Sequence, residues 1–222
     1  DGNVIVAVSE AFYIDPTFTD VYAWDIASGA PPTMVSGPLG EGSAAFPSVS
    51  GDGRFITFTT SKRLAGESTN LFGPWVYLTE RANPFTFRRI GAADKPAYQS
   101  SISSDGSQVA FVVAAQPCEY DDSEFDELHY FCRGIRVDTA YGTPGLTSMA
   151  IETVIGELNY SYHFQPVISG NGRWVAWITD NQVGFNIEGG TLVPDIDGIH
   201  LYMRRRDPAI VVDPVDFGTI QA

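Results

Sequence analysis

The chain has 222 residues, of which 44% are hydrophobic and 13% aromatic, and its formal net charge is −14 at pH 7. This apolar content is sufficient for a packed core, which excludes a disordered chain. No apolar run reaches the length of about 18 residues that predicts a membrane-spanning helix. The acidic charge also excludes nucleic acid and anionic membranes as favoured partners.

Short runs rich in β-branched and aromatic residues alternate with turn-forming clusters along the chain, and helical periodicity is nearly absent. This pattern predicts an all-β protein built from many short strands. In chain order, the predicted strands include Val4–Ser9, Asp20–Ile26, Arg54–Thr60, Trp75–Thr79, Phe85–Ile90, Gln108–Ala114, Gly134–Asp138, Ala150–Ile155, Trp174–Thr179, Ile199–Arg204 and Ala209–Val212.

One motif recurs three times, as Ser50–Phe58, Ser103–Phe111 and Ser169–Trp177. Each copy contains a serine, an Asp-Gly or Asn-Gly pair two residues later, and then an apolar strand. Asp-Gly and Asn-Gly supply the positive φ that a tight hairpin turn requires. Four antiparallel strands in each period of roughly 50 residues are typical of β-propeller blades. The predicted blades span residues 1–36 together with 217–222, then 46–91, 98–156 and 163–213.

The two ends of the chain match two halves of the same motif. Asp1–Ala7 matches the second half, and Gly218–Ala222 matches the first half. We therefore predict that a closure strand completes the first blade and closes a four-bladed propeller without exposed edges. Two alternatives remain open: the chain is a piece of a longer propeller, or this strand pairs with a neighbouring molecule. The closure strand consists of Phe217, Gly218, Thr219, Ile220, Gln221 and Ala222.

The repeated motif resembles the PD40, or WD40-like, repeat of TolB-type β-propellers. It is carried by Ser50–Phe58, Ser103–Phe111 and, with Asn in place of Asp, Ser169–Trp177. The resemblance implies a scaffold that binds other proteins or ligands, often outside the cytoplasm. We therefore expect a secreted protein in the extracellular space or the periplasm. The chain begins at Asp1 with no visible signal peptide, so we expect a mature or trimmed form.

The connections between second and third strands are long, at residues 10–20, 61–74, 116–133 and 180–198. Their formal charges are −3, +1, −5 and −4, which total −11 of the −14 of the whole chain. In a propeller these loops share one face, so the pattern predicts an acidic binding face that favours cations or a basic partner surface. The predicted face consists of Asp15, Asp20, Glu119, Asp121, Asp122, Glu124, Asp126, Glu127, Asp195 and Asp197.

Two cysteines, Cys118 and Cys132, flank the most acidic loop with 13 residues between them. This arrangement predicts a disulfide in an oxidising compartment, with two free thiols as the alternative. Clustered carboxylates also provide oxygen ligands for Ca²⁺, but no Asp-x-Asp-x-Asp-Gly loop is present. We therefore predict no resident cofactor and leave calcium as an open alternative. The candidate ligands are Asp121, Asp122, Glu124 and Asp126.

Signatures of catalysis are weak. His129, His163 and His200 lack the spacing of zinc ligands, and neither a Gly-x-Ser-x-Gly elbow nor a phosphate-binding loop occurs. We predict a non-catalytic binding or assembly module with a protein or glycan partner. One alternative is a structural subunit of an extracellular filament, in which copies join by strand exchange or through Arg204–Arg206. A second alternative is a glycan-active hydrolase or a lectin.

Overall fold

A computed structural model of the chain describes residues 2–10, 18–37, 42–62, 64, 74–91, 96–117, 131–139, 149–150, 161–181, 184–188, 191–195, 198–205 and 215–219. The regular elements in these ranges are all strands, which confirms the predicted all-β class. Within the same ranges, no helix is long and apolar enough to cross a membrane.

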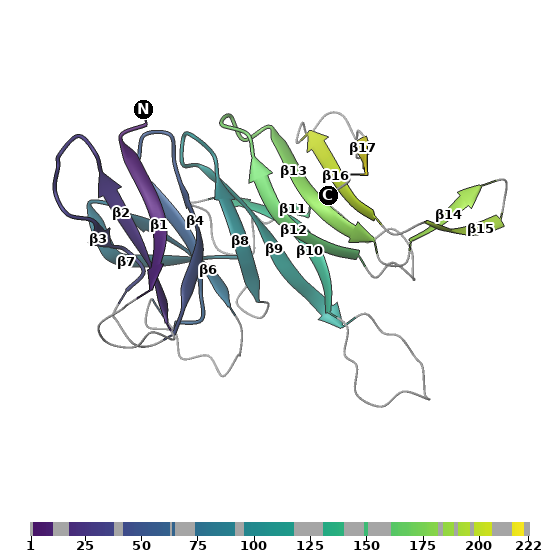
Figure 1. Cartoon of the computed structure of the whole chain (residues 1–222), viewed down its shortest axis with the longest axis horizontal. Coiled ribbons are helices and arrows are strands. Elements are labelled where there is room, and N and C mark those ends of the chain that lie inside the picture. The colour runs from purple at the N-terminus through teal and green to yellow at the C-terminus, as the bar shows by residue number, and fades with distance from the viewer. Residues whose placement is uncertain are drawn as a thin grey trace.

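The strands of the described residues form four larger antiparallel sheets that follow one another in chain order (Figure 1). A two-stranded ribbon is inserted between β13 and β16. Sheet I contains β1 (Val4–Glu10), β2 (Thr19–Asp25) and β3 (Thr33–Met34). Sheet II contains β4 (Ala44–Val49), β5 (Phe55–Thr60), β6 (Trp75–Glu80) and β7 (Asn83–Ile90). Sheet III contains β8 (Ala97–Ile102), β9 (Gln108–Pro117), β10 (Phe131–Thr139) and β11 (Met149–Ala150). Sheet IV contains β12 (Ser161–Ile168), β13 (Trp174–Asn181), β16 (Gly198–Arg205) and β17 (Val215–Thr219). The ribbon contains β14 (Gly184–Glu188) and β15 (Thr191–Asp195).

The predicted strands agree closely with these elements. Those expected from Val4, Trp75, Gln108 and Trp174 begin at those residues in the structure. The ribbon β14–β15 was not predicted, because its residues were assigned to one long connection. The strand predicted at 209–212 lies outside the described residues, so it stays a prediction, and among the described strands β17 pairs with β16 in sheet IV.

The predicted closure of the ring is not confirmed. β17 pairs with β16, so that Thr219 lies opposite His200 and Val215 opposite Met203. The predicted closure strand therefore contributes its residues 217–219 to sheet IV, not to sheet I. β1 is an outer strand of sheet I and pairs with β2. The similarity of the chain ends to the motif correctly predicted a strand at residues 217–219. It did not predict the partner of that strand, because a strand pairs with the sheet edge that lies nearest to it in space.

The three predicted turns are confirmed in detail. In the first, the Ser50 hydroxyl donates to Oδ1 of Asp52 at 2.6 Å and accepts from the Phe55 N–H at 2.9 Å, while Gly53 adopts φ +71°. The second and third turns repeat this pattern around Asp105 and Asn171. Gly2 has φ +73°, against +73° and +69° for the glycines of the later turns. The backbone of Gly2 before β1 thus resembles that of the later turn glycines.

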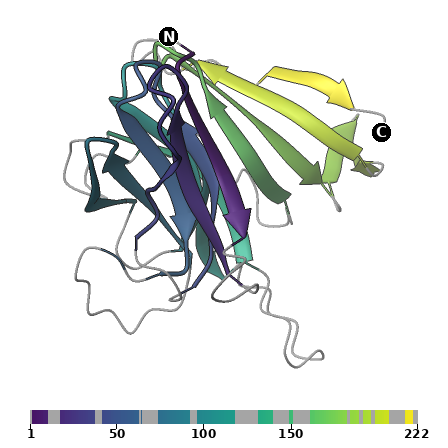
Figure 2. The same ribbon diagram turned by 60° about the vertical axis from the view of Figure 1, so that its left-hand side comes forward.

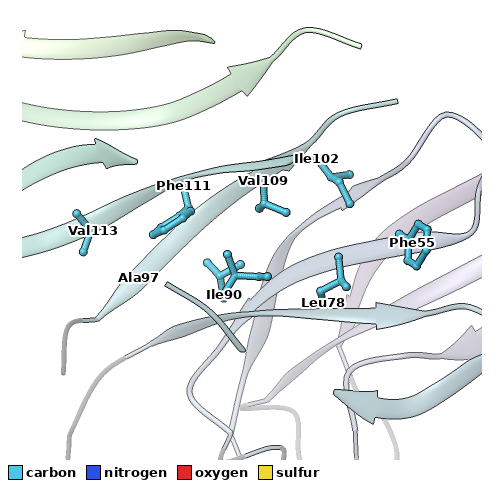
Figure 3. Close-up of a cluster of buried hydrophobic side chains, with 9 residues drawn as sticks. Phe55, Leu78, Ile90, Ala97, Ile102, Val109, Phe111 and Val113 are labelled. Carbon is cyan, nitrogen blue, oxygen red and sulfur yellow. The ribbon is translucent and has the colours of Figure 1, made fainter. Parts of the chain in front are cut away.

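The hydrophobic core lies between consecutive sheets, whose ribbons Figure 2 shows from a second direction. One cluster lies between sheets I and II, a second between II and III (Figure 3), and a third between III and IV. β5 is buried along its whole length, because it packs on sheet I through one face and on sheet III through the other. Each fully buried Val, Ile or Phe side chain stabilises the fold by about 1.5–3 kcal/mol.

Candidate functional site

The first strands of sheets II, III and IV share a strained bulge. The pairing register shifts between Ala45 and Ser48 in β4, and at the corresponding places in β8 and β12. At each bulge a residue other than glycine has positive φ: Phe46 at 52°, Gln99 at 53° and Gln165 at 51°. A left-handed conformation costs a residue with a side chain about 1–2 kcal/mol. Such strain persists only where the surroundings impose it, and it is concentrated at functional sites.

The three bulges line one groove of about 280 Å³. Figure 1 shows why, because β4, β8 and β12 lie in series across the molecule. Phe46 and Val167 are 48% and 60% exposed, so the groove carries apolar side chains open to solvent. The nine lining residues that the structure describes are all uncharged: Phe46, Pro47, Ser48, Gln99, Ser100, Ser101, Gln165, Pro166 and Val167.

Hydrogen bonds between neighbouring sheets fix the walls of the groove. The backbone N–H of Gln99 donates to Oγ1 of Thr59 at 2.9 Å, and the N–H of Gln165 donates to Oε1 of Gln99 at 3.0 Å. Two serine hydroxyls also accept hydrogen bonds from backbone N–H groups of the next sheet. Oγ of Ser48 accepts from the Ile102 N–H at 3.1 Å, and Oγ of Ser101 accepts from the Ile168 N–H at 3.2 Å. The groove is therefore preorganised by side chains that bridge one sheet to the next.

The described lining of this groove offers amide, hydroxyl and apolar groups. Groups of this kind orient a ligand through hydrogen bonds and shape. The described residues that line it include no histidine, cysteine or carboxylate to act as a general acid, a general base or a metal ligand. In the described ranges as a whole, no group of three or more His, Cys, Asp or Glu side chains is placed to hold a metal ion.

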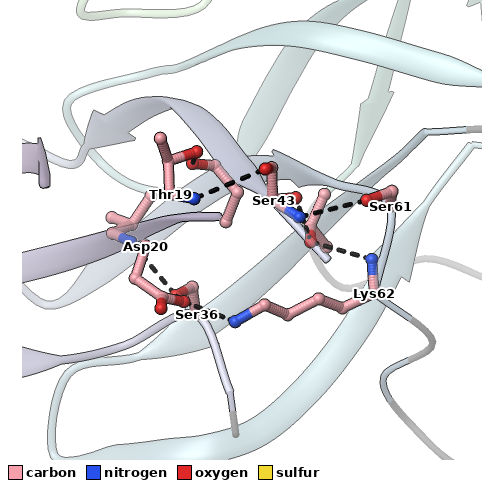
Figure 4. A network of polar contacts seen from close by, with 9 residues as sticks. Thr19, Asp20, Ser36, Ser43, Ser61 and Lys62 are labelled. Carbon is pink, nitrogen blue, oxygen red and sulfur yellow. Dashed lines mark hydrogen bonds and ion pairs between the residues drawn. The ribbon is translucent and has the colours of Figure 1, made fainter. Parts of the chain in front are cut away.

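Asp20, predicted to belong to the acidic face, is buried, and this assignment is corrected. Its side chain is 0% exposed and pairs with Nζ of Lys62, which is also 0% exposed. Oδ1 of Asp20 also accepts from the Ser36 hydroxyl at 2.6 Å (Figure 4). The sequence places Lys62 in another loop, 42 residues away. Only the packing of sheet I on sheet II brings the two charges together and removes both from the surface.

Further polar contacts surround this ion pair and join the same two sheets (Figure 4). The N–H of Thr19 donates to Oγ of Ser43 at 3.4 Å, and the N–H of Ser43 donates to Oγ of Ser61 at 3.2 Å. The N–H of Lys62 donates to Oγ1 of Thr60 at 3.0 Å. This network holds the backbone before Lys62 in place, so its long side chain extends along a defined path to Asp20.

The other predicted site residues are described in part or not at all. Asp195 ends β15 and lies opposite Gly184 of the ribbon, and Cys132 lies within β10. The acidic face, the disulfide and the calcium alternative therefore stay predictions. The residues outside the described ranges are Asp15, Cys118, Glu119, Asp121, Asp122, Glu124, Asp126, Glu127 and Asp197.

Sequence reasoning missed the groove, although the sequence contains a signal for it. Phe46, Gln99 and Gln165 each precede the Asp or Asn of their turn by six residues, and a proline follows two of the three. An equivalent position in every repeat indicates an equivalent backbone geometry. Positive φ at residues with side chains was not foreseeable, because sequence statistics assign that conformation to glycine, asparagine and aspartate.

Comparison with known proteins supports the fold. No known family model matches the chain, and no curated protein sequence matches it. Among solved structures, a TolB protein from Agrobacterium tumefaciens aligns with a TM-score of 0.59 at 12% identity, over 97% of this chain and 61% of that one. A prolyl endopeptidase aligns with a TM-score of 0.57 at 14% identity, over 92% of this chain and 27% of that one. A puromycin-hydrolysing peptidase from Mycobacterium tuberculosis aligns with a TM-score of 0.56 at 10% identity, over 97% of this chain and 31% of that one.

The chain thus spans less than two thirds of the length of each of these proteins. At such low identity the likeness concerns the backbone and carries no catalytic residue across. The likeness agrees with the repeated Ser-x-Asp/Asn-Gly turns and with the sheets that follow one another in chain order. Together these observations show that the chain has a TolB-like β-propeller fold.

Proposed function

We propose that this protein is a non-catalytic binding module that holds an uncharged, extended segment of a partner protein in the groove between β4, β8 and β12. One observation carries the proposal: the same strained backbone recurs at Phe46, Gln99 and Gln165, around a single groove. The TolB-like fold supports a binding role without selecting the partner.

The lining of the groove favours a peptide as the ligand. Phe46 and Val167 provide exposed apolar contacts, and Ser48, Gln99 and Ser101 provide polar groups between them. This alternation suits an extended chain, whose side chains and backbone polar groups also alternate. Phe46 is the single aromatic side chain among the described residues of the lining, and a single ring is a poor stacking surface for a glycan. A glycan is therefore the less favoured partner.

The predicted acidic loops form a second part of this proposal. Asp20 and Lys62 neutralise each other inside the protein, so their removal from the loops leaves the loop charge at −11. Loops of this charge would attract a partner with basic residues beside its uncharged segment. We also propose a secreted or periplasmic location, in keeping with the predicted disulfide between Cys118 and Cys132.

A selected peptide tests the groove. A displayed library of random peptides is selected on the folded protein, and the winning peptide is titrated into isotope-labelled protein. We expect the largest amide shifts at Ser48, Ser101 and Val167. We also expect Phe46→Ala to weaken binding about tenfold or more, because buried aromatic contacts dominate binding energy.

Phe85→Ala is the matched control, because Phe85 is 64% exposed on β7 and does not line the groove. Its affinity for the peptide should equal that of the wild type. Equal affinity of Phe46→Ala and Phe85→Ala would overturn the groove proposal. If the selected peptides bind only through basic residues and cause no amide shifts in the groove, the acidic loops and not the groove are the binding site.

A further inference from the structure

The buried ion pair between sheets I and II brings an amine and a carboxyl group into contact. Nζ of Lys62 is hydrogen-bonded to Oδ1 of Asp20, and both side chains are 0% exposed. Figure 4 shows the extended Lys62 side chain reaching the carboxyl group, beside which Ser36 lies. An amine in hydrogen-bond contact with one carboxyl oxygen lies about 3–3.5 Å from the carboxyl carbon, which is the separation of two groups ready to react.

The three side chains at this contact are closed to water. Asp20, Ser36 and Lys62 are each 0% exposed, and Oδ2 of Asp20 has no hydrogen-bond partner among the described residues. The carboxylate therefore keeps only part of the stabilisation that water would give it. A reaction that removes both charges is favoured more at this place than in solution, and its product is not exposed to water that could reverse it.

The Ser36 hydroxyl prepares the carboxyl group for attack by the amine. It donates to Oδ1 of Asp20 at 2.6 Å, while its own oxygen accepts from the Val21 N–H at 3.0 Å, which fixes its position. A donor placed in this way stabilises the negative charge that develops on a carbonyl oxygen when its carbon is attacked. Oδ1 is thus the oxygen that is kept, and Oδ2 is the oxygen that leaves.

We propose that Lys62 and Asp20 condense to an isopeptide bond, which joins sheets I and II covalently. One proton passes from the Nζ ammonium to the carboxylate, which leaves a neutral amine and a neutral acid. Nζ then forms a bond to Cγ, a second proton passes from Nζ to Oδ2, and the Cγ–Oδ2 bond breaks as water departs. The third proton stays on the new amide nitrogen. Atoms and charge balance without a further reactant.

The bond closes a long loop of the chain, because its two residues are 42 positions apart. A covalent closure of this kind restricts the unfolded chain and so favours the folded one. Sheet I then cannot separate from sheet II while the bond is intact. Chain that has not yet reacted holds the ion pair, and it is the reference for variants of Asp20 and Lys62.

Mass spectrometry of the whole chain tests this proposal. At purification or during incubation in neutral buffer, the folded chain should lose the mass of one water. Trypsin should then release the peptide that ends at Arg54 joined to residues 55–63, because Asp20 lies in the first and Lys62 in the second. A chain that is folded by circular dichroism but keeps its full mass throughout would overturn the proposal.

Two substitutions identify the reacting groups. Lys62→Arg keeps the positive charge, but a guanidinium does not condense with a carboxyl group, so this variant should keep its full mass. Asp20→Asn offers an amide in place of the carboxyl group, so the lost mass should be that of ammonia and not of water. Loss of water from Lys62→Arg would show that another part of the chain dehydrates, and it would contradict the bond.

Arg81→Lys is the matched control for access of water. Arg81 pairs with Asp25 at 2.9 Å, and the two side chains are 37% and 32% exposed. The substitution places an amine beside a carboxylate that water still hydrates, so this variant should lose the same single water as the wild type. Loss of a second water would contradict the role of burial on which the proposal rests.

Ser36→Ala tests the proposed role of the hydroxyl. Without this donor the bond should form about tenfold more slowly or worse, so that more chain keeps its full mass at any one time. Circular dichroism verifies that the variant folds. An equal fraction of bonded chain in the folded variant and in the wild type would overturn the assignment of Ser36.

Discussion

The junction between sheets I and II and the junction between sheets II and III share one backbone geometry but are filled differently. The second buries an apolar cluster around Phe55, Val109 and Phe111 (Figure 3), and its one buried carboxylate among the described residues, Asp138, accepts from the Gly91 N–H at 3.3 Å. The first adds the buried ion pair of Asp20 and Lys62 to its apolar cluster (Figure 4). The repeated motif thus specifies the turns and their contacts, whereas the buried side chains between the sheets differ from one junction to the next.

The difference has an energetic consequence. An apolar junction loses stability in proportion to the atoms removed from it. A buried ion pair behaves differently, because each charge loses its hydration and is stabilised chiefly by its partner. Oδ2 of Asp20 has no hydrogen-bond partner among the described residues, so Asp20 depends on Ser36 and Lys62 through Oδ1. Removal of one charge should therefore cost more than removal of both.

Lys62→Met gives the largest expected effect. It leaves the Asp20 carboxylate buried beside Ser36 alone, and we expect the free energy of unfolding to fall by about 3–5 kcal/mol. The double variant Asp20→Leu with Lys62→Met should recover most of this loss, because no uncompensated charge remains. Denaturant unfolding measures both.

Glu80→Gln is the control for the first experiment. It breaks the ion pair of Arg54 and Glu80, which has an N–O distance of 2.7 Å and side chains 58% and 32% exposed. A solvent-exposed pair of this kind contributes about 0–1 kcal/mol. If Lys62→Met cost no more than Glu80→Gln, the distinction between the two junctions would be wrong.

The turn glycines give an intermediate effect and compare the junctions directly. Gly29→Ala measures the cost of positive φ alone, about 1–2 kcal/mol. Gly106→Ala adds a clash with the buried ring of Phe55, for a further cost of about 1–3 kcal/mol. Gly53→Ala should lie between them, because Val4, which it meets, is only partly buried on the outer strand β1. Thermal or denaturant unfolding should rank the three in this order, and a Gly53→Ala variant less stable than Gly106→Ala would contradict it.

The smallest expected effect is on the pH dependence of the free energy of unfolding, through the aspartates of the first two turns. The Ser50 hydroxyl and then the Arg54 N–H hold the pKa of Asp52 below its usual value, and Ser103 and then Ser107 do the same for the pKa of Asp105. A lowered pKa in the folded state stabilises the fold above the pKa of the unfolded state, and this stability is lost as the pH falls through the folded value. Asn171 holds the third turn without titrating.

Asp52→Asn with Asp105→Asn should therefore flatten the acid limb of the stability curve, with little change at neutral pH. Unfolding measured from pH 7 down to about pH 2 tests this, since that range crosses the ordinary pKa of an aspartate. An acid limb as steep as that of the wild type would show that other carboxylates control the acid response.

Much of the fold was predictable because its signals are local. An Asp-Gly or Asn-Gly pair selects its turn wherever it occurs, and the strand that follows has a period of two side chains. These rules placed the turns at Asp52, Asp105 and Asn171 and the strands that follow them. They also agree with the positive φ of Gly2, which precedes β1 as the other turn glycines precede their strands.

The errors share one cause. The count of loop charges predicted that Asp20 lies on the surface. Asp20 is buried because it forms an ion pair with Lys62, which the packing of sheet II on sheet I brings beside it. The match between the chain ends assigned residues 217–222 to sheet I, but β17 pairs with the nearer strand β16. In both cases a residue was assigned from its neighbours in sequence, whereas its partner was decided in three dimensions.

By itself, the sequence determined the all-β class, the repeated turns and the strand positions, because hydrogen bonds and side-chain periodicity within a few residues specify them. The tertiary structure decided two other features. These are the buried ion pair between sheets I and II and the groove at Phe46, Gln99 and Gln165. Each depends on contacts between residues tens of positions apart, and only the packing of one sheet against the next creates them.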